Sequence, residues 1–387
     1  MTYLDEYRSA VGEVVGVPPE HVTLYWKGRV ALYAILRALG IGPGDEVIVP
    51  AFTCIAVPNA VLYSGAVPVY VDIDETTYTP DPAAVAAAMC PRTRAVLAQN
   101  TFGLSTDVEA LSAVAARHGA VVIDDCAHGL GGEYRGRPNG AAAHAAFYST
   151  QWSKPISTGL GGIAVTKDAE LARGLRRLEK TAREPAVVER ALLRALVVAR
   201  DRIATANTIS AGRTVYRALG HVGLVPGSSS RSELARPEMP STFFTRMSTV
   251  QARLGRHRLR SLRDAVMRRR ESAARYSEWL AARRRTVAHE PAFSTHAFLR
   301  YPLRVRERDT FLKEARRRGL HLGDWFDSPL HPIRADDLTR WGYRWGTNPV
   351  AERVTAEIVN LPTDLPPEGR HLRAIEELLD AFVDCIV

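Results

Sequence analysis

Residues 40–74 read GIGPGDEVIVPAFTCIAVPNAVLYSGAVPVYVDID and hold a complete strand–helix–strand unit. A turn rich in glycine leads into a short strand-like run that ends at residue 50, and residues 67–74 form a second run. Residues 55–64, which lie between the two runs, resemble a helix. Strands that are joined by a helix usually pair in parallel, so this unit predicts a parallel sheet.

The same alternation continues on both sides of this unit. Residues 30–39, VALYAILRAL, have the apolar density of a buried helix that ends at Gly40. Further elements are expected as helices at 82–90 and 107–118 and as strands at RAVLAQN, AVVIDD, AAFYS and GGIAVT. Strands that alternate with helices over residues 30–166 predict an α/β domain with a mainly parallel sheet.

Residues 185–230 have a different character. They are mostly apolar with interspersed arginines, and this pattern predicts one or two amphipathic helices followed by a loop. The stretch ALLRALVVAR places arginine among apolar residues at helical spacing, which suits contact with a membrane surface. We prefer the alternative interpretation, in which this insert is a lid or a helix that packs in a dimer.

The C-terminal part predicts a second, smaller unit. A long arginine-rich helix is expected at 247–283, and shorter helices are expected at 309–318 and about 368–385, with strand-like runs between them. We therefore predict a large domain at 1–245, which includes the helical insert, and a long linking helix with a smaller α+β domain at 246–387.

The composition is that of a globular protein with a large core. The chain has 387 residues, 46% hydrophobic and 24% charged, with a formal net charge of +9. A net positive charge of this size suits the binding of phosphorylated or carboxylated substrates. No nucleic-acid binding is expected, because the basic clusters lie on expected helices, where a solvated face explains them.

Cysteine usage and the N-terminus bear on the compartment. The four cysteines contain no CxxC pair, which argues against a zinc site or a disulfide scaffold and fits a reducing compartment. The N-terminal MTYLDEYRSAVGEVVG lacks the pattern of a signal peptide, and no apolar run reaches about twenty residues. We therefore expect a cytoplasmic protein without a spanning helix.

Lys154 is the first candidate catalytic residue. It lies within FYSTQWSKPISTGLGGIAVT, residues 147–166, in a chain whose other basic residues are overwhelmingly arginine. Arginine stays charged, whereas a desolvated lysine amine can lose its proton and attack a carbonyl. This residue choice is typical of an amine that holds an aldehyde cofactor.

Such a cofactor requires further partners, and the sequence supplies them in order. A carboxylate keeps a pyridine ring nitrogen protonated, and Asp125 ends the strand-like run VVIDD, with His128 three residues later. A phosphate binds backbone N–H groups where a helix begins. The start of YWKGRVALYAIL and a nearby hydroxyl are the candidates for this role: Gly28, Arg29, Val30 and Ser149.

Each of these signals alone has an ordinary structural explanation. A lysine beside two glycines is often a turn lysine, two aspartates after a strand often cap a helix, and His128 could be a core histidine. The order of the signals carries the weight. A glycine at a helix start, an aspartate after a strand and a lysine after a strand follow one another on an α/β pattern.

These motifs resemble the DegT/DnrJ/EryC1/StrS family of pyridoxal-phosphate aminotransferases, which has the fold-type-I, aspartate aminotransferase-like architecture. The resemblance covers nearly the whole chain and includes the stretch at 40–74, VVIDDCAHGLGG, SKPISTGLGGIAVT, RMSTVQARLGRHRLRSL and NPVAERVTAEIVNLPTDL. It implies that Lys154 is the Schiff-base lysine, Asp125 the partner of the ring nitrogen and His128 a ring contact. It implies that Ser149 and the turn at 28–30 hold the phosphate, and that the protein is a homodimer with shared active sites.

Among the departures of the chain from the family pattern, three are at single positions. Cys54, a cofactor-binding position, stands where an aromatic side chain often stacks on the cofactor. Leu160 replaces an acidic residue before the glycine pair, and Phe244 replaces an asparagine that often reaches the phosphate in the partner subunit. These departures place the substrate pocket and the reaction type in question more than cofactor binding.

The resemblance implies a transfer of an amino group from L-glutamate, or a similar donor, to a nucleotide-linked keto sugar in glycan or natural-product biosynthesis. Two alternatives stay open. The first is other pyridoxal-phosphate chemistry, such as dehydration or the amination of a cyclitol. The second is a non-catalytic regulatory protein that binds the cofactor. The aromatic loop DWFDSPLHP and the stretch WGYRWG either shape the acceptor pocket or pack in the core.

Overall fold

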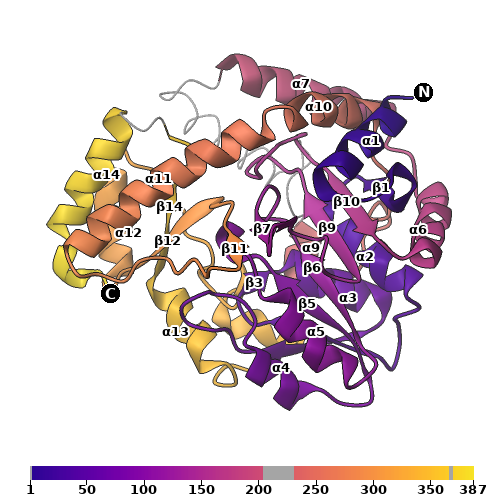
Figure 1. Ribbon diagram of the computed structural model, residues 1–387, viewed down its shortest axis with the longest axis horizontal. Coiled ribbons are helices and arrows are strands. Elements are labelled where there is room, and N and C mark those ends of the chain that lie inside the picture. Colours follow the sequence, from indigo (N-terminus) through magenta and orange to yellow (C-terminus); the bar gives the residue numbers. More distant parts are fainter. Residues whose placement is uncertain (1, 204–230, 366–368) are drawn as a thin grey trace.

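The computed structural model describes residues 2–203, 231–365 and 369–387, and its centre is a seven-stranded sheet (Figure 1). The strand order is β1-β10-β9-β6-β5-β2-β4. The bounds are β1 Val22–Tyr25, β2 Glu46–Pro50, β4 Val67–Val71, β5 Thr93–Gln99, β6 Val121–Asp125, β9 Ala145–Ser149 and β10 Gly162–Thr166. β9, β6, β5, β2 and β4 run parallel, while β10 is antiparallel to both of its neighbours. The sheet is therefore mainly parallel, as predicted.

Both faces of the sheet are covered by helices, which explains why its strands read as continuous apolar runs. In β2, Val47 and Val49 join one buried cluster with α2 and α3, while Ile48 joins another with α4 and α5. The N-terminal helices are α1 Tyr3–Val15, α2 Gly28–Ala38, α3 Ala56–Ser64, α4 Pro82–Ala88, α5 Val108–Ala116 and α6 Ala169–Thr181. Alternate side chains of a strand point to opposite faces, so this pattern buries both.

The prediction of one long helix at 247–283 is wrong, because the structure has two. α10 spans Thr249–Leu259 and α11 spans Leu262–Ala282. At the break, the Ser261 hydroxyl and the Ser261 N–H both donate to the carbonyl oxygen of Arg258, at 3.0 and 3.2 Å. A serine side chain that bonds to the nearby backbone competes with the regular helical bonds.

The C-terminal part contains a small antiparallel sheet. β12, Arg300–Arg304, pairs with β14, Ile358–Pro362. The helices around it are α12 Arg308–Arg317, α13 Pro349–Glu357 and α14 Arg370–Ala381. The expected helices at 309–318 and 368–385 thus correspond to α12 and α14, while residues 366–368 lie outside the described residues.

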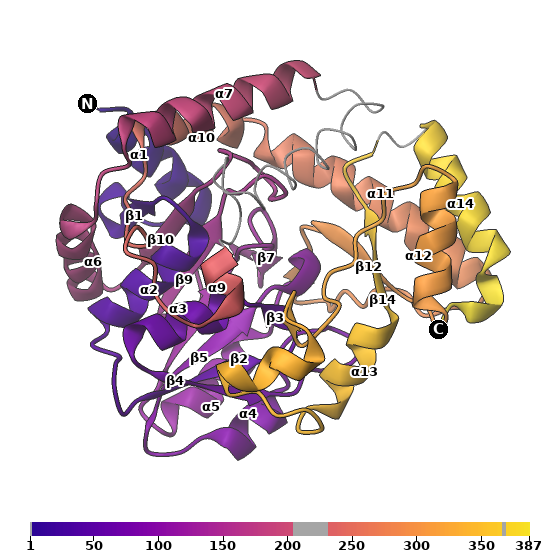
Figure 2. The same cartoon turned by 180° about the vertical axis from the view of Figure 1, so that it is seen from behind.

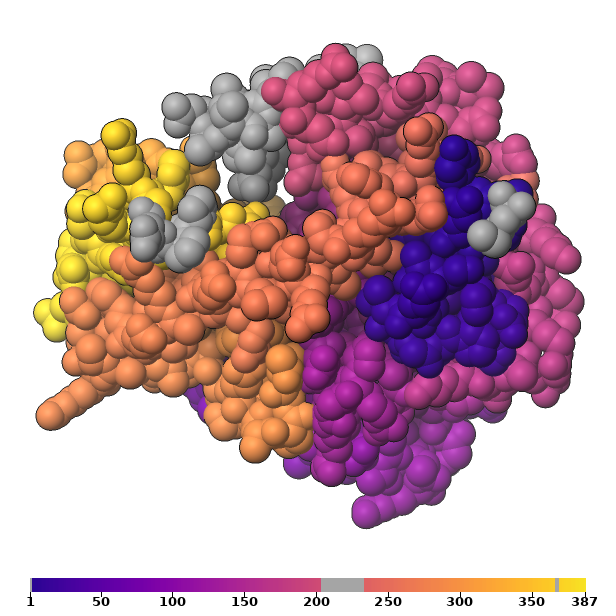
Figure 3. Space-filling model, turned by 45° about the horizontal axis from the view of Figure 1, so that its top comes forward, coloured from indigo at the N-terminus to yellow at the C-terminus, as the bar shows by residue number. Residues whose placement is uncertain are grey.

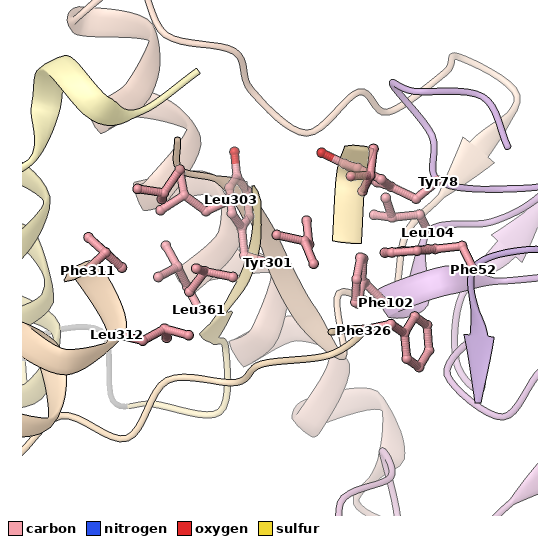
Figure 4. Close-up of a cluster of buried hydrophobic side chains, with 14 of the residues drawn as sticks. Phe52, Tyr78, Phe102, Leu104, Tyr301, Leu303, Phe311, Leu312, Phe326 and Leu361 are labelled. Carbon is pink, nitrogen blue, oxygen red and sulfur yellow. The ribbon is translucent and has the colours of Figure 1, made fainter. Parts of the chain in front are cut away.

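One apolar cluster joins the two parts of the chain. Phe52 and Phe102, from the N-terminal part, surround Phe326, with ring centroids 5.0 and 6.0 Å away (Figure 4). The two-residue strands β3, Thr53–Cys54, and β13, Leu330–His331, also pair in parallel across this junction. The predicted division at residue 245 stays a prediction, and the junction fixes the loop before β13 against the large sheet.

Helix α7, Val187–Ile203, occupies the first part of the predicted insert, and residues 204–230 lie outside the described residues. α7 lies along α10 (Figures 1 and 2), and Arg258 forms an ion pair with Asp201 at 2.6 Å. In Figure 3 the segments of α1 (indigo), α10 (orange) and α7 (pink) meet on one face. None of the helices in the described ranges is long and apolar enough to cross a membrane.

Candidate active site

A cavity lies where the parallel strands β5, β6 and β9 end, which is the expected place for a ligand in such a sheet. Its open space is about 670 Å³, including the part that is open to solvent. The predicted site residues that line it are Gly28, Arg29, Cys54, Asp125, His128, Ser149 and Lys154.

Val30 is the one predicted site residue that does not line the cavity. Its side chain is fully buried in the apolar cluster of α2. Its backbone N–H donates to the carbonyl oxygen of Lys27 at 3.1 Å. The residue therefore helps to form the first turn of α2, and its N–H is engaged within that turn.

The start of α2 has the form of an anion site. Lys27 is the N-cap residue of α2 and provides no side-chain cap, so the first N–H groups of the helix lack this internal acceptor. Gly28 lies directly against the end of β9. A Cβ added at Gly28 would lie 2.9 Å from Cβ of Ser149 and 3.3 Å from its Oγ. Only glycine therefore allows the helix end and the serine hydroxyl to meet at this point of the cavity.

The two aspartates at the end of β6 have separate roles. Asp124 accepts hydrogen bonds from Nδ2 of Asn100 at 2.6 Å and from the Gly140 N–H at 2.8 Å, so both of its oxygens serve the structure. Asp125 faces the cavity. Its Oδ1 accepts from the Ala127 N–H at 2.9 Å, and its Oδ2 makes no hydrogen bond with the described residues. Asp125 can therefore accept a hydrogen bond from a ligand.

Burial disfavours the charged forms of Asp125 and Lys154. Desolvation raises the pKa of Asp125 to about 7, although the positive charge of Lys154 opposes the shift. Desolvation lowers the pKa of Lys154 to about 8, although the interactions of the amine with Cys54 and with the carboxylate of Asp125 oppose the shift. An appreciable fraction of the Lys154 amine is thus unprotonated near neutral pH, which is the form that attacks a carbonyl.

His128 is held as a neutral hydrogen-bond donor toward the site. Its Nδ1 accepts the backbone N–H of Phe102 at 3.2 Å, so in the neutral ring the proton resides on Nε2. Burial lowers the pKa of His128 well below its usual range, and the charges of Lys154 and Arg300 add to this effect. Nε2–H can therefore donate to an oxygen of a ligand.

The aromatic loop places two rings at or beside the site, so core packing explains only part of its role. Phe326 lines the cavity. The Trp325 ring stacks on His128, with centroids 5.6 Å apart and planes at 17°, and Nζ of Lys154 lies 5.5 Å from the centroid of the same indole. The density of aromatic residues in DWFDSPLHP was the signal in the sequence.

A buried ion cluster at the start of α2 was not predicted. Arg29 pairs with Glu233 at 2.7 Å, and Nζ of Lys27 lies 4.0 Å from the same carboxylate. Burial, with the charge of Arg29, lowers the pKa of Lys27 to about 8, and Glu233 opposes the shift. Glu233 belongs to the short helix α9, Arg231–Ala235, which is far from α2 in sequence. Nothing in the local sequence indicates this contact.

Leu160 and Phe244, two of the departures from the family pattern, serve packing. Leu160 is buried with Trp26 and with Leu193 of α7, so it anchors that helix over the lysine loop. Phe244 packs against the rings of Tyr25 and Tyr33. Neither side chain lines the cavity.

The donor set fits pyridoxal phosphate. An amine, a carboxylate with an unused oxygen, a histidine that donates and a helix N-terminus beside a serine hydroxyl meet in one cavity. These groups match the aldehyde, the ring nitrogen, the phenolic oxygen and the phosphate of that cofactor. No group of histidine, cysteine or acidic residues in the described ranges is arranged to hold a metal ion.

Comparisons with known proteins agree with this interpretation. A family model described as the DegT/DnrJ/EryC1/StrS aminotransferase family matches residues 2–375. The GDP-perosamine synthase of Caulobacter vibrioides is 39% identical over 183 residues, which cover 47% of this chain and 49% of that protein. The chain thus spans about half the length of this relative.

Two further comparisons extend over most of the chain. The pleiotropic regulatory protein of Geobacillus stearothermophilus is 30% identical over 344 residues, which cover 87% of this chain and 77% of that protein. The crystal structure of S. venezuelae DesV in complex with a ketimine intermediate has a TM-score of 0.76 and 27% identity, and the match covers 99% of this chain and 90% of that chain. The predicted fold-type-I architecture is thereby confirmed.

Proposed function

The chain belongs to the DegT/DnrJ/EryC1/StrS aminotransferase family, and we propose on this basis that it is a pyridoxal-phosphate-dependent aminotransferase. The donor is L-glutamate or a similar amino acid, and the acceptor is a keto sugar, carried on a nucleotide, in glycan or natural-product biosynthesis. The observation that supports the proposal most strongly is that Lys154, Asp125 and His128 line one cavity with the start of α2.

Each of these residues has a distinct task in the proposed reaction. When bound, pyridoxal phosphate supplies an electron sink for the carbon that loses its proton. Lys154 would hold the cofactor through its amine. Freed by the incoming donor, Nζ of Lys154 would act as the base that takes the proton from the donor α-carbon and then as the acid that gives it back.

Asp125 and His128 adjust the ring from two sides. The free oxygen of Asp125 would hold a proton at the ring nitrogen, because an opposite charge favours the charged form of the ring. Nε2–H of His128 would donate to the phenolic oxygen. Gly28 and Arg29, through their backbone N–H groups, and the hydroxyl of Ser149 would hold the phosphate. Cys54 lines the same cavity and would contact the ring.

The visible spectrum of the purified protein tests the proposal. Wild-type protein loaded with pyridoxal phosphate should be yellow and should bleach when L-glutamate is added, while Lys154→Ala should bind the cofactor without turnover. Product analysis with and without a keto acceptor separates transamination from dehydration or another reaction on the same cofactor, and a cyclitol ketone tests the cyclitol alternative. Undiminished transamination by Lys154→Ala would refute the assignment of Lys154 as the catalytic lysine.

A regulatory role is the second candidate function, because the relative with 87% coverage of this chain is named a pleiotropic regulatory protein. A cofactor-binding protein without turnover would stay yellow with every amino donor. The presence of both Lys154 and Asp125 in the cavity favours catalysis.

The assembly proposed for this protein is a cytoplasmic homodimer with active sites at the subunit interface. α7 is proposed to act as a lid or packing helix, since Leu193 anchors it on Leu160. Its outward side chains Val187 and Val188 are 71% and 70% exposed. Light scattering after size-exclusion chromatography measures the oligomer, and co-sedimentation with liposomes tests the membrane alternative.

A further inference from the structure

Two buried arginines lie beside the candidate site and are incompletely neutralised. Arg269 of α11 and Arg300 at the start of β12 are only 7% and 9% exposed. Both donate to the carbonyl oxygen of Leu299, at 3.1 and 3.2 Å. Within the described ranges, the only carboxylate in contact with either guanidinium is that of Asp364, 3.5 Å from Nη1 of Arg300, and this side chain is 49% exposed. A buried cation without a matching anion is costly, so a bound anion would stabilise this pair.

Arg300 retains donors for such an anion. Every hydrogen bond that its side chain makes with the described residues comes from Nη1. Nε and Nη2, which form one edge of the guanidinium fork, have no protein partner there. This edge matches the two oxygens of a carboxylate, and such bidentate pairs are among the strongest hydrogen bonds in proteins.

Arg300 and Lys154 face the same indole ring. The guanidinium carbon of Arg300 lies 5.8 Å from the ring centroid of Trp325, and Nζ of Lys154 lies 5.5 Å from it. The positive charge of Arg300 also contributes to the lowered pKa values of Lys154 and His128. The arginine therefore belongs to the electrostatic environment of the lysine amine.

The small β12–β14 sheet fixes the position of both Arg300 and Trp325. Arg300 is paired with Pro362 in the β12–β14 sheet. Asn360 of β14 accepts from the backbone N–H of Trp325 at 2.9 Å and donates to its carbonyl oxygen at 2.7 Å. Groups that are fixed on strands and by backbone bonds keep their geometry without a ligand, which reduces the entropy cost of binding.

We propose that Arg300, beside the indole of Trp325, binds the α-carboxylate of the amino donor. The inference rests on the proposed function, which brings the donor amine to the position of Nζ of Lys154. The donor carries its carboxylate on the carbon that bears this amine, so the carboxylate must lie close to that position. Besides Lys154, the cations that line the cavity are Lys27 and Arg29, and both are paired with Glu233 at the start of α2. Arg300 thereby selects α-amino acids over simple amines.

Single-turnover bleaching of the cofactor-loaded protein tests this assignment. Arg300→Gln should raise the apparent Kd for L-glutamate by about 10- to 100-fold, the effect of losing a charged hydrogen-bond partner. The rate with γ-aminobutyrate, which lacks the α-carboxylate, should be the same in both proteins. Arg300→Lys should give an intermediate Kd, because it keeps the charge and loses the fork. The control is Arg306→Gln, which removes an exposed arginine near the same strand and should match wild type.

Calorimetric titration with glutarate, an unreactive dicarboxylate, adds a readout without chemistry. The affinity for glutarate should fall at least tenfold in Arg300→Gln. If no amino donor bleaches the protein and glutarate binding still depends on Arg300, the subsite stands while the proposed aminotransferase activity fails. If glutamate bleaches wild type, Arg300→Gln and Arg300→Lys with equal Kd, or if wild type does not bind glutarate, the subsite is overturned. Should Arg300→Gln fail to fold, Arg300→Lys decides, and an unchanged Kd overturns the inference.

Discussion

Replacing Gly28 with alanine tests whether the approach of α2 to β9 builds the phosphate site. The added Cβ would lie 2.9 Å from Cβ of Ser149, whereas carbon atoms in contact are about 3.5–4.0 Å apart. The helix or the strand end must therefore move. Overpacking costs about 1–3 kcal/mol, and alanine returns up to about 1 kcal/mol through its helix propensity. We expect the free energy of unfolding to fall by about 0–3 kcal/mol.

The larger effect of Gly28→Ala should be on cofactor affinity. A shift of α2 separates its first N–H groups from the Ser149 hydroxyl, so a bound phosphate cannot contact both. A hydrogen bond to a charged group contributes about 1.5–3 kcal/mol, which corresponds to roughly 10- to 150-fold weaker binding. Titration of the protein with pyridoxal phosphate, followed by visible absorbance, measures this change, and urea unfolding of the cofactor-free protein measures the stability.

Two further variants separate the steric effect from a general loss of stability. Gly174→Ala, in α6, places its Cβ 3.6 Å from Cβ of Ala38, an ordinary contact, so it should be neutral or stabilising. Gly28→Ala combined with Ser149→Gly removes the clash, so it should recover stability while cofactor binding stays weak without the hydroxyl. Equal stability and equal cofactor affinity in Gly28→Ala and Gly174→Ala would refute the reasoning.

Two other perturbations follow from the buried groups. In the cofactor-free protein, Lys154→Met should raise the free energy of unfolding by about 1–3 kcal/mol near neutral pH, because the folded pKa of Lys154 is about 8 against an ordinary value of 10.5. Between pH 8 and 10.5 the lysine binds its proton in the unfolded chain but not in the folded protein, so the stability of the wild type should rise with pH over this range. The stability advantage of Lys154→Met should therefore shrink as the pH rises. A constant stability difference from pH 7 to 10 in urea titrations would contradict this. Leu193→Ala should cost about 2–5 kcal/mol if α7 unfolds with the rest of the chain, whereas the exposed Val188→Ala should cost almost nothing; equal urea midpoints for the two would show that α7 is not anchored at Leu160.

The parallel strands were predictable because they are buried on both faces and therefore read as continuous apolar runs. The start of β2 shows this directly, since Val47 and Ile48 enter clusters on opposite faces. The break between α10 and α11 was not predictable from periodicity, because it depends on where one serine side chain bonds, at the Arg258 carbonyl. Local competition of this kind leaves the hydrophobic pattern unchanged.

The order of motifs along the chain predicted the candidate site only in part. Asp125, His128 and Lys154 could be found because each lies at or shortly after the end of a strand at the same edge of the sheet. The contacts of Glu233 with Arg29 and of Arg300 with Trp325 could not be found, since tertiary packing brings these residues together from distant elements. Val30 shows the opposite error: proximity to Gly28 in sequence suggested a contact that the turn of the helix prevents.

The three groups predicted to act on the cofactor share one electrostatic property. Burial shifts the pKa of Asp125 upward and the pKa values of Lys154 and His128 downward, so each is pushed toward its neutral form. Keeping an amine and a carboxylate desolvated in one cavity costs folding free energy. A ligand that places a cationic ring nitrogen beside Asp125 and ties up the Lys154 amine would remove that cost. Relief of this cost adds to the affinity for the cofactor, so cofactor binding should stabilise the fold by an amount that its concentration and dissociation constant determine.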